Sequence, residues 1–181
     1  MKVKLCTALF ALILLSSCTT IMPTYVWNFD PIQQKVSNEY FDAEIFPIID
    51  DQKFSWQERG YNSFRLSLTN KSDKDIEVDW NKTLFISQGQ TSGGFMFEGV
   101  VYSTRNNPKP PDVVFAHSSM SKIIYPNALV FYSSNVGSLT GINYGGWNHA
   151  YMGSGENGIY LSVIVEGKEI KEKLTVNLSK K

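Results

Sequence analysis

Residues 64–80, FRLSLTNKSDKDIEVDW, decide the fold expected for this chain. From Phe64 to Leu68 every second residue is apolar, and this period of two is typical of a half-buried β-strand. The alternation resumes from Ile76 to Trp80. Between the two runs, residues 70–75 are rich in Asn, Ser and Asp, whose side chains bond to nearby backbone and favour a turn. The segment therefore predicts a strand, a turn and a second strand, most simply an antiparallel hairpin.

A second unit of the same kind closes the chain. Apolar residues alternate from Ile159 to Val165, residues 166–169 form the predicted turn, and residues 170–178 return with Leu174, Val176 and Leu178 on the inner face. Shorter runs with turn residues between them lie at 40–49, 83–87, 94–103, 122–125 and 128–133. We expect an all-β fold of about eight or nine antiparallel strands packed as a β-sandwich, with a closed barrel as the alternative. A short helix at residues 31–36 is also compatible with the sequence.

The N-terminal residues 1–17 have the pattern of a signal peptide. Lys2 and Lys4 precede the apolar run Leu5–Leu15, whose eleven residues would rise only about 16 Å as a helix, too little to cross a bilayer core. Leu15-Ser16-Ser17-Cys18 follows and resembles the lipobox of bacterial lipoproteins. An ordinary secretory signal that happens to contain a cysteine is the alternative.

The lipobox resemblance implies cleavage before Cys18 and attachment of lipid, including palmitate-type acyl chains, to that residue. Cys6 would be lost with the signal peptide, so Cys18 would be the only cysteine of the mature chain and lipidation would account for it. Thr19 follows where an Asp would imply retention in the inner membrane, so the resemblance implies the outer membrane. We expect residues 18–31 to be a lipidated tether, with aromatic residues that dock on the domain, and residues 32–181 to be the sandwich.

Residues 64–80 also look like part of the small bacterial lipoproteins of uncharacterised role that have an immunoglobulin-like β-sandwich. Pro110-Pro111 and the strand expected at Ile123–Tyr125 are similar to the middle of that pattern. The resemblance implies an immunoglobulin-like fold and a location in the bacterial envelope. It brings no catalytic residues.

Composition and motifs argue against several classes of function. Removal of residues 1–17 leaves 15 basic and 17 acidic residues among 164, without the basic excess of a nucleic-acid-binding protein. His117 and His149 are the only histidines and do not occur in a metal-binding motif, so we expect no metal or other cofactor. The chain has no GxSxG motif, no Walker loop and no Rossmann glycine pattern that follows a strand, and its paired carboxylates lie in turn-like segments. An enzyme is not expected.

Two loop regions remain as sites of interaction. Residues 106–112 contain three prolines and predict a rigid connection between sheets, or less simply a polyproline ligand. Residues 137–158 predict a long glycine-rich loop that carries Tyr144, Trp147, His149 and Tyr151. These aromatic side chains are candidates for binding a sugar or a protein partner, or alternatively fold back over a sheet edge.

Asp79-Trp80-Asn81-Lys82-Thr83 matches the acidic sequon of some bacterial N-glycosylation systems, which makes Asn81 a weak candidate for a glycan. The leading functional hypothesis is a non-catalytic, protein-binding or structural module, anchored to the membrane through Cys18. A carbohydrate-binding module that uses residues 137–158 is the second hypothesis, and an enzyme acting on envelope polymers is the third.

Overall fold

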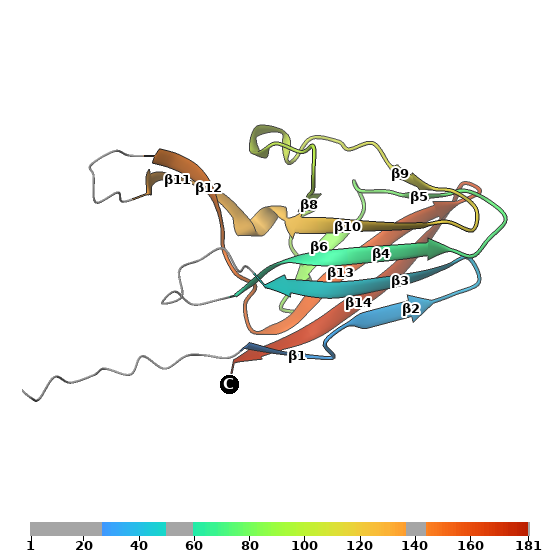
Figure 1. Ribbon diagram of the computed structural model, residues 1–181, viewed down its shortest axis with the longest axis horizontal. Coiled ribbons are helices and arrows are strands. Elements are labelled where there is room, and N and C mark those ends of the chain that lie inside the picture. Colours follow the sequence, from blue (N-terminus) through green and yellow to red (C-terminus); the bar gives the residue numbers. More distant parts are fainter. Residues whose placement is uncertain (1–26, 50–59, 137–143, 181) are drawn as a thin grey trace, which may run out of the picture.

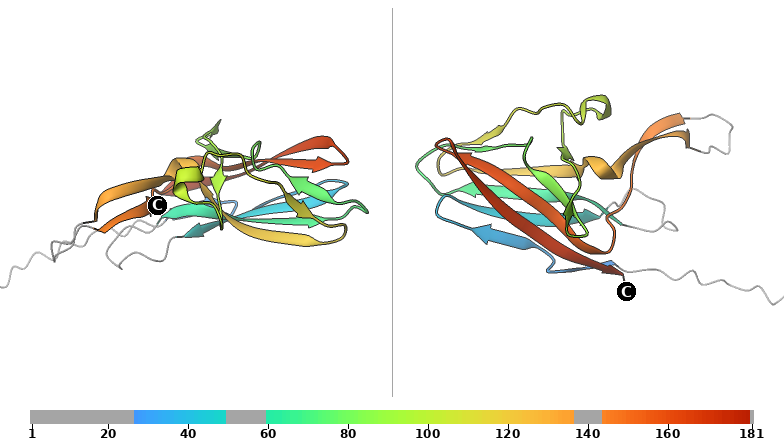
Figure 2. Two further views of the ribbon diagram at one scale, coloured as in Figure 1. Left: turned by 90° about the horizontal axis from the view of Figure 1, so that it is seen from above. Right: turned by 180° about the vertical axis from the view of Figure 1, so that it is seen from behind.

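The computed structural model describes residues 27–49, 60–136 and 144–180, and most of these residues lie in β-strands (Figure 1). Two antiparallel sheets pack face to face, and they are seen as two layers from above in Figure 2. This confirms the predicted all-β, antiparallel sandwich, rather than the closed barrel. The predicted signal peptide and Cys18 lie outside the described residues.

The larger sheet has seven strands. Its main path is β1-β14-β13-β5-β9, while β6 pairs with β13 and β7 pairs with β6. Their bounds are β1 Trp27–Asp30, β5 Ile76–Val78, β6 Leu84–Ser87, β7 Gln90–Thr91, β9 Asp112–Val114, β13 Gly155–Val165 and β14 Lys168–Lys180. Strand β1 lies within the residues that the sequence assigned to the tether, so the end of that segment belongs to the sheet.

The smaller sheet has five strands in the order β2-β3-β4-β10-β8. Their bounds are β2 Gln34–Ser37, β3 Phe41–Ile49, β4 Tyr61–Asn70, β8 Phe95–Met96 and β10 Ser119–Pro126. Two more strands, β11 Val130–Val136 and β12 Tyr144–His149, pair only with each other, and single 3-10 turns occupy Tyr102–Thr104 and Asn127–Leu129. The described residues thus form fourteen strands rather than eight or nine, because several strands have only two to four residues.

Alternate residues of the long strands fill the space between the sheets. β3 and β4 contribute Phe41, Ala43, Ile45, Phe64, Leu66 and Leu68, and β13 and β14 contribute Ile159, Leu161, Val163, Val165, Leu174, Val176 and Leu178. Each of these side chains is at most 3% exposed. Burial of apolar side chains on this scale is the main force that holds two sheets together.

The predicted hairpin at the end of the chain is confirmed. β13 and β14 pair from Gly155 to Val165, and Val165 lies opposite Lys168, which leaves a turn of two residues. Glu166 and Gly167 both have positive φ, 49° and 79°. This is the geometry of the tight turns that match the twist of paired strands, and Gly adopts it without steric cost.

Two local predictions are wrong. β4 and β5 do not form a hairpin, because β4 lies in the smaller sheet and β5 in the larger one, so residues 71–75 cross between the layers. Residues 31–36 are not helical. Strand β2 begins at Gln34, and its pairing with β3 decides the conformation of a segment with little preference of its own.

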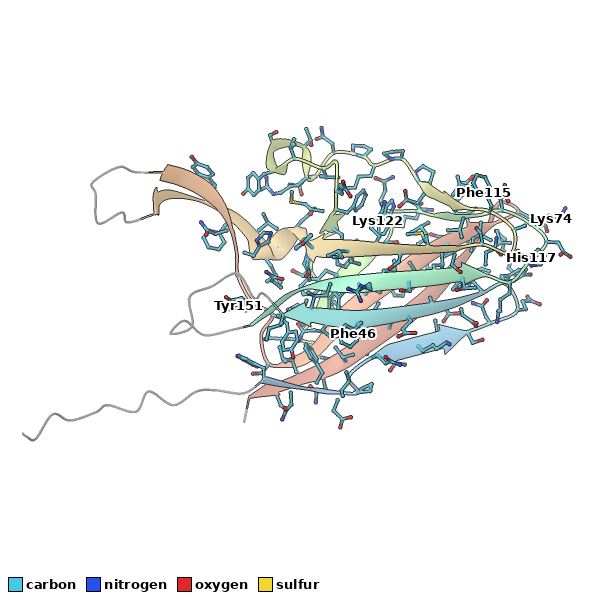
Figure 3. The ribbon with its side chains drawn as sticks, viewed as in Figure 1. Phe46, Lys74, Phe115, His117, Lys122 and Tyr151 are labelled. Carbon is cyan, nitrogen blue, oxygen red and sulfur yellow. The ribbon has the colours of Figure 1, made fainter. Side chains whose placement is uncertain are left out.

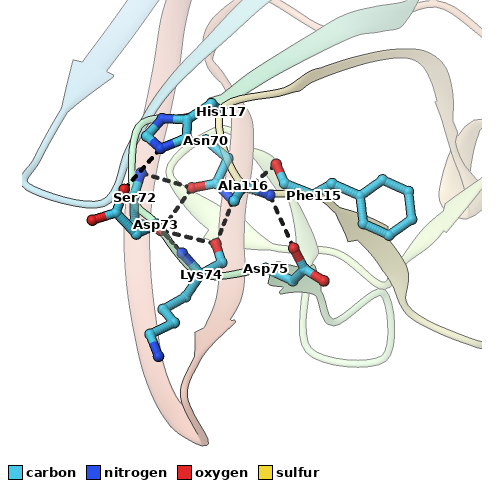
Figure 4. Close-up of polar contacts among 8 residues, drawn as sticks. All are labelled: Asn70, Ser72, Asp73, Lys74, Asp75, Phe115, Ala116 and His117. Carbon is cyan, nitrogen blue, oxygen red and sulfur yellow. Dashed lines mark hydrogen bonds and ion pairs between the residues drawn. The ribbon is translucent and has the colours of Figure 1, made fainter.

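The side-chain amide of Asn70 connects this crossing to a second one (Figure 4). Asn70 is 1% exposed, and its Nδ2 donates hydrogen bonds to the carbonyl oxygens of Lys74, Val114 and Phe115 at 2.7, 3.0 and 3.1 Å. Its Oδ1 accepts hydrogen bonds from the backbone N–H and the hydroxyl of Ser72. Residues 70–76 and 114–119 both cross between the sheets, so one buried amide ties the two crossings together.

We expect Asn70→Ala to lower the free energy of unfolding by about 3 kcal/mol, because it removes the hydrogen bonds that this buried amide makes to both crossings, including the one to the buried carbonyl oxygen of Val114. Chemical denaturation of the variant measures the loss. Asn177→Ala, at an exposed position of β14, is the matched control and should change stability by less than about 0.5 kcal/mol. Equal effects of the two changes would contradict the role given to Asn70.

Candidate functional site

Strands β11 and β12 form a two-stranded ribbon that extends from one end of the sandwich (Figure 1). Tyr132 lies opposite Trp147, and Val136 lies opposite Tyr144. The prediction of one long loop at residues 137–158 is therefore wrong: residues 144–149 are a strand, and β13 begins at Gly155. Pairing with β11 outweighs the low strand preference of Gly145 and Gly146.

Of the four predicted binding residues, two pack within the protein. A Cβ atom on Gly60 would lie 2.2 Å from Cγ of Tyr151, so the Tyr151 ring rests directly on the backbone of Gly60. The His149 ring lies 5.2 Å from the ring of Tyr125 on β10, measured between centroids. This agrees with the alternative that the aromatic residues fold back over a sheet edge.

Tyr144 and Trp147 are placed by their backbone in β12, and their side chains lie outside the described part of the structure. Two other aromatic residues of the ribbon were not singled out from the sequence. Phe131 is 46% exposed and Tyr132 is 53% exposed. As neighbours in a strand they point to opposite faces, so both faces of the ribbon carry an aromatic side chain.

A signal for this surface is present in the sequence. No Asp, Glu, Lys or Arg occurs from Ile123 to Gly155, a run of 33 residues, although the whole chain has 17 acidic and 17 basic residues. This charge-free segment contains the entire ribbon. A surface without charge is unusual for a protein that has one charged residue in about five.

Asn81, the candidate for glycosylation, is engaged in the fold. Its Nδ2 donates to the carbonyl oxygen of Lys109 at 2.9 Å, and its Oδ1 accepts from the backbone N–H of Lys109 at 2.8 Å. A glycan on Nδ2 would have to displace the first of these contacts. Glycosylation stays a prediction, and the amide of Asn81 serves to hold the proline-rich segment.

That proline-rich segment, residues 106–112, does connect the two sheets, because it leads from β8 in the smaller sheet to β9 in the larger one. A polar contact closes the sandwich beside it. Asp112 accepts a hydrogen bond from Trp80 Nε1 at 2.9 Å and forms an ion pair with Lys122 of β10. The Lys122 ammonium also lies 4.2 Å from the centre of the Phe97 ring. Lys122 therefore joins β10 of the smaller sheet to β9, the outer strand of the larger sheet.

Other carboxylates also hold strands together. Glu156 of β13 pairs with Lys173 of β14 at 2.7 Å, and the hydrogen bond from Lys173 lowers the pKa of Glu156 below its usual value. The pKa of Glu169 is likewise lowered, chiefly by the hydrogen bond from the hydroxyl of Ser162 at 2.9 Å. Each of these acidic groups is charged in the folded protein and bonded to a neighbouring strand.

His117, the other histidine, lies at the end of the sandwich away from the ribbon (Figure 3). Its Nε2 is 2.8 Å from Oδ1 of Asp73, and both side chains are exposed. Across residues 27–49, 60–136 and 144–180, no three His, Cys, Asp or Glu side chains are grouped to hold a metal ion. The same residues include no helix with the length and hydropathy needed to span a membrane.

Comparison of this chain with protein-family models, with curated proteins and with solved structures finds no match.

We expect Gly60→Ala to lower stability by about 2 kcal/mol, because the new Cβ must displace the Tyr151 ring. In a Tyr151→Ala background the same change should cost at least about 1 kcal/mol less, and denaturation of all four proteins in the cycle measures this coupling. Gly94→Ala is the control, since a Cβ there meets its nearest atoms at 3.9 Å. Additive effects at positions 60 and 151 would contradict a packing role for Tyr151.

Proposed function

We propose that this chain is a bacterial lipoprotein, held in the outer membrane by lipid on Cys18, and that its sandwich is a non-catalytic module that binds another envelope protein. The observation that carries the proposal is Leu15-Ser16-Ser17-Cys18 directly after a short apolar run. Thr19, rather than an Asp, supports the outer membrane.

The start of the domain supports a close anchor. Strand β1 begins at Trp27, nine residues after Cys18, and pairs with the end of β14. Phe29 of β1 packs edge-on against Tyr61 with ring centroids 4.3 Å apart. Nine residues reach roughly 30 Å when fully extended, so lipid on Cys18 would keep the sandwich next to the bilayer.

The distribution of polar groups supports a binding role rather than catalysis. Asp112, Glu156 and Glu169 each bond to a residue of another strand, and their charges stabilise the pairing of strands and sheets. These three carboxylates therefore serve to hold the fold together, which fits a module without catalysis.

A surface for a protein partner lies at the end of the sandwich away from the ribbon, where Figure 3 places Phe115, His117 and Lys74. Strand β9 is the outer strand of the larger sheet there. Val113 within it is 48% exposed and Phe115 just after it is 66% exposed. An edge strand with exposed apolar side chains can pair with an extended segment of another protein.

Cys18→Ala should abolish lipidation. The protein should then move from the membrane to the soluble fraction of the cell envelope, because buried acyl chains are its strongest attachment to the bilayer. Fractionation at high salt and the intact mass of the mature protein check this. Ser17→Ala keeps a small residue before the cysteine and serves as the control. A mature protein whose intact mass shows no acyl chains on Cys18 would overturn the proposed anchor.

A photo-crosslinking residue, p-benzoylphenylalanine, in place of Phe115 should capture one specific envelope protein in intact cells, since the proposed partner covers this side chain. The same residue in place of Lys35, exposed on the outer face of the smaller sheet, is the control. Gel electrophoresis and mass spectrometry of the adducts give the result. The partner surface is wrong if position 115 yields no adduct beyond those seen at position 35.

A further inference from the structure

The β11–β12 ribbon differs chemically from the rest of the surface. It lies inside the charge-free run from Ile123 to Gly155, and the only ionisable side chains in this run belong to tyrosines and His149. The ribbon itself therefore offers no acidic or basic side chain other than His149 to a partner. The ribbon is therefore suited to a neutral environment that accepts aromatic and small polar groups.

The exposed aromatic residues fit one such environment, the interface of a lipid bilayer. Phe131 and Tyr132 expose about half of their surface on opposite faces of the ribbon. The ribbon pairs with no other described strand, so both of its outer edges lack a strand partner there. Aromatic rings with a polar tip favour the headgroup region, where one part is apolar and the other wet.

The position of the ribbon gives the second argument. The ribbon and the start of β1 lie at the same end of the sandwich, and all the views in Figures 1 and 2 agree on this. Trp27 is nine residues from Cys18, a reach of roughly 30 Å. Lipid on Cys18 would therefore keep the end of the molecule from which the ribbon extends within reach of the bilayer.

We propose that the β11–β12 ribbon inserts its aromatic side chains into the interface of the bilayer to which the protein is anchored. This inference rests on the proposed lipidation of Cys18. The ribbon is then a second contact with the membrane, and it directs the end that carries Phe115 away from the lipid. Because the ribbon has no charged residue, its insertion does not depend on anionic lipid.

The test uses residues 18–181 with Cys18→Ser and an N-terminal hexahistidine, bound to phosphatidylcholine vesicles that contain a nickel-chelating lipid. This tether replaces the acyl chains, so the result does not depend on whether cells lipidate Cys18. The chain then has no cysteine, and Tyr132→Cys introduces a single thiol for an environment-sensitive fluorophore. Phe115→Cys at the opposite end of the sandwich is the matched control.

On vesicles, the fluorophore at position 132 should shift its emission to shorter wavelength and be quenched by spin-labelled lipid, at low and at high salt alike. The fluorophore at position 115 should show neither effect. Phe131→Ser in the labelled chain should reduce the quenching, and circular dichroism checks that this variant is folded. If the fluorophore at position 132 emits on vesicles as it does in water, the inference is wrong. If position 132 is shielded from water only in intact cells, a protein partner covers it instead.

Discussion

Every crossing between the layers of a sandwich leaves backbone groups that no strand partner satisfies, and in this protein one buried amide bonds to carbonyl groups in two crossings. Asn70 bonds to carbonyl oxygens in residues 70–76 and in residues 114–119. Each crossing starts in one sheet and ends in the other. The first leads from β4 to β5 and the second from β9 to β10, so the two crossings determine which sheet contains each of these strands. The contact of Trp80, Asp112 and Lys122 depends on the same placement, because β9 and β10 bring Asp112 and Lys122 together across the edge of the sandwich.

The parts of the fold that the sequence predicts correctly are those in which pairing is local. In β13 and β14, apolar and polar residues alternate on both sides of a two-residue turn. This pattern specifies which side chains face the core and also which strand pairs with which. In β4 and β5 the same alternation specifies the inner face, but both sheets border the same core. A strand that crosses to the other layer therefore has the same pattern as a strand that turns back. The five residues 71–75 are long enough for either route, and the observed route is the one in which Asn70 bonds to Val114 and Phe115, which are distant in sequence.

The candidate site shows a similar limit. Its location was predictable, since the aromatic residues of 144–151 stand out in the sequence, but their roles were not. Tyr151 packs on Gly60, and His149 lies against Tyr125, because segments distant in the chain meet there. Phe131 and Tyr132 belong to one of the shorter runs expected to be strands. They are about half exposed, and whether another part of the chain covers a strand is a property of the tertiary structure. The charge-free run was the sequence signal that pointed to them.

The two ends of the sandwich differ in a way that bears on the proposed anchor. A single lipidated residue on a tether of nine residues holds a domain near a membrane but leaves its orientation free. An uncharged aromatic ribbon at the same end adds a second point of contact, and two points restrict rotation far more than one. The opposite end carries an exposed ion pair between Lys74 and Glu166, and the exposed side chains of Asp73 and His117 lie 2.8 Å apart beside it. Burial of such charges in lipid is costly, so electrostatics and the ribbon favour the same orientation. The edge strand β9 and Phe115 then face away from the bilayer, where an envelope protein can reach them.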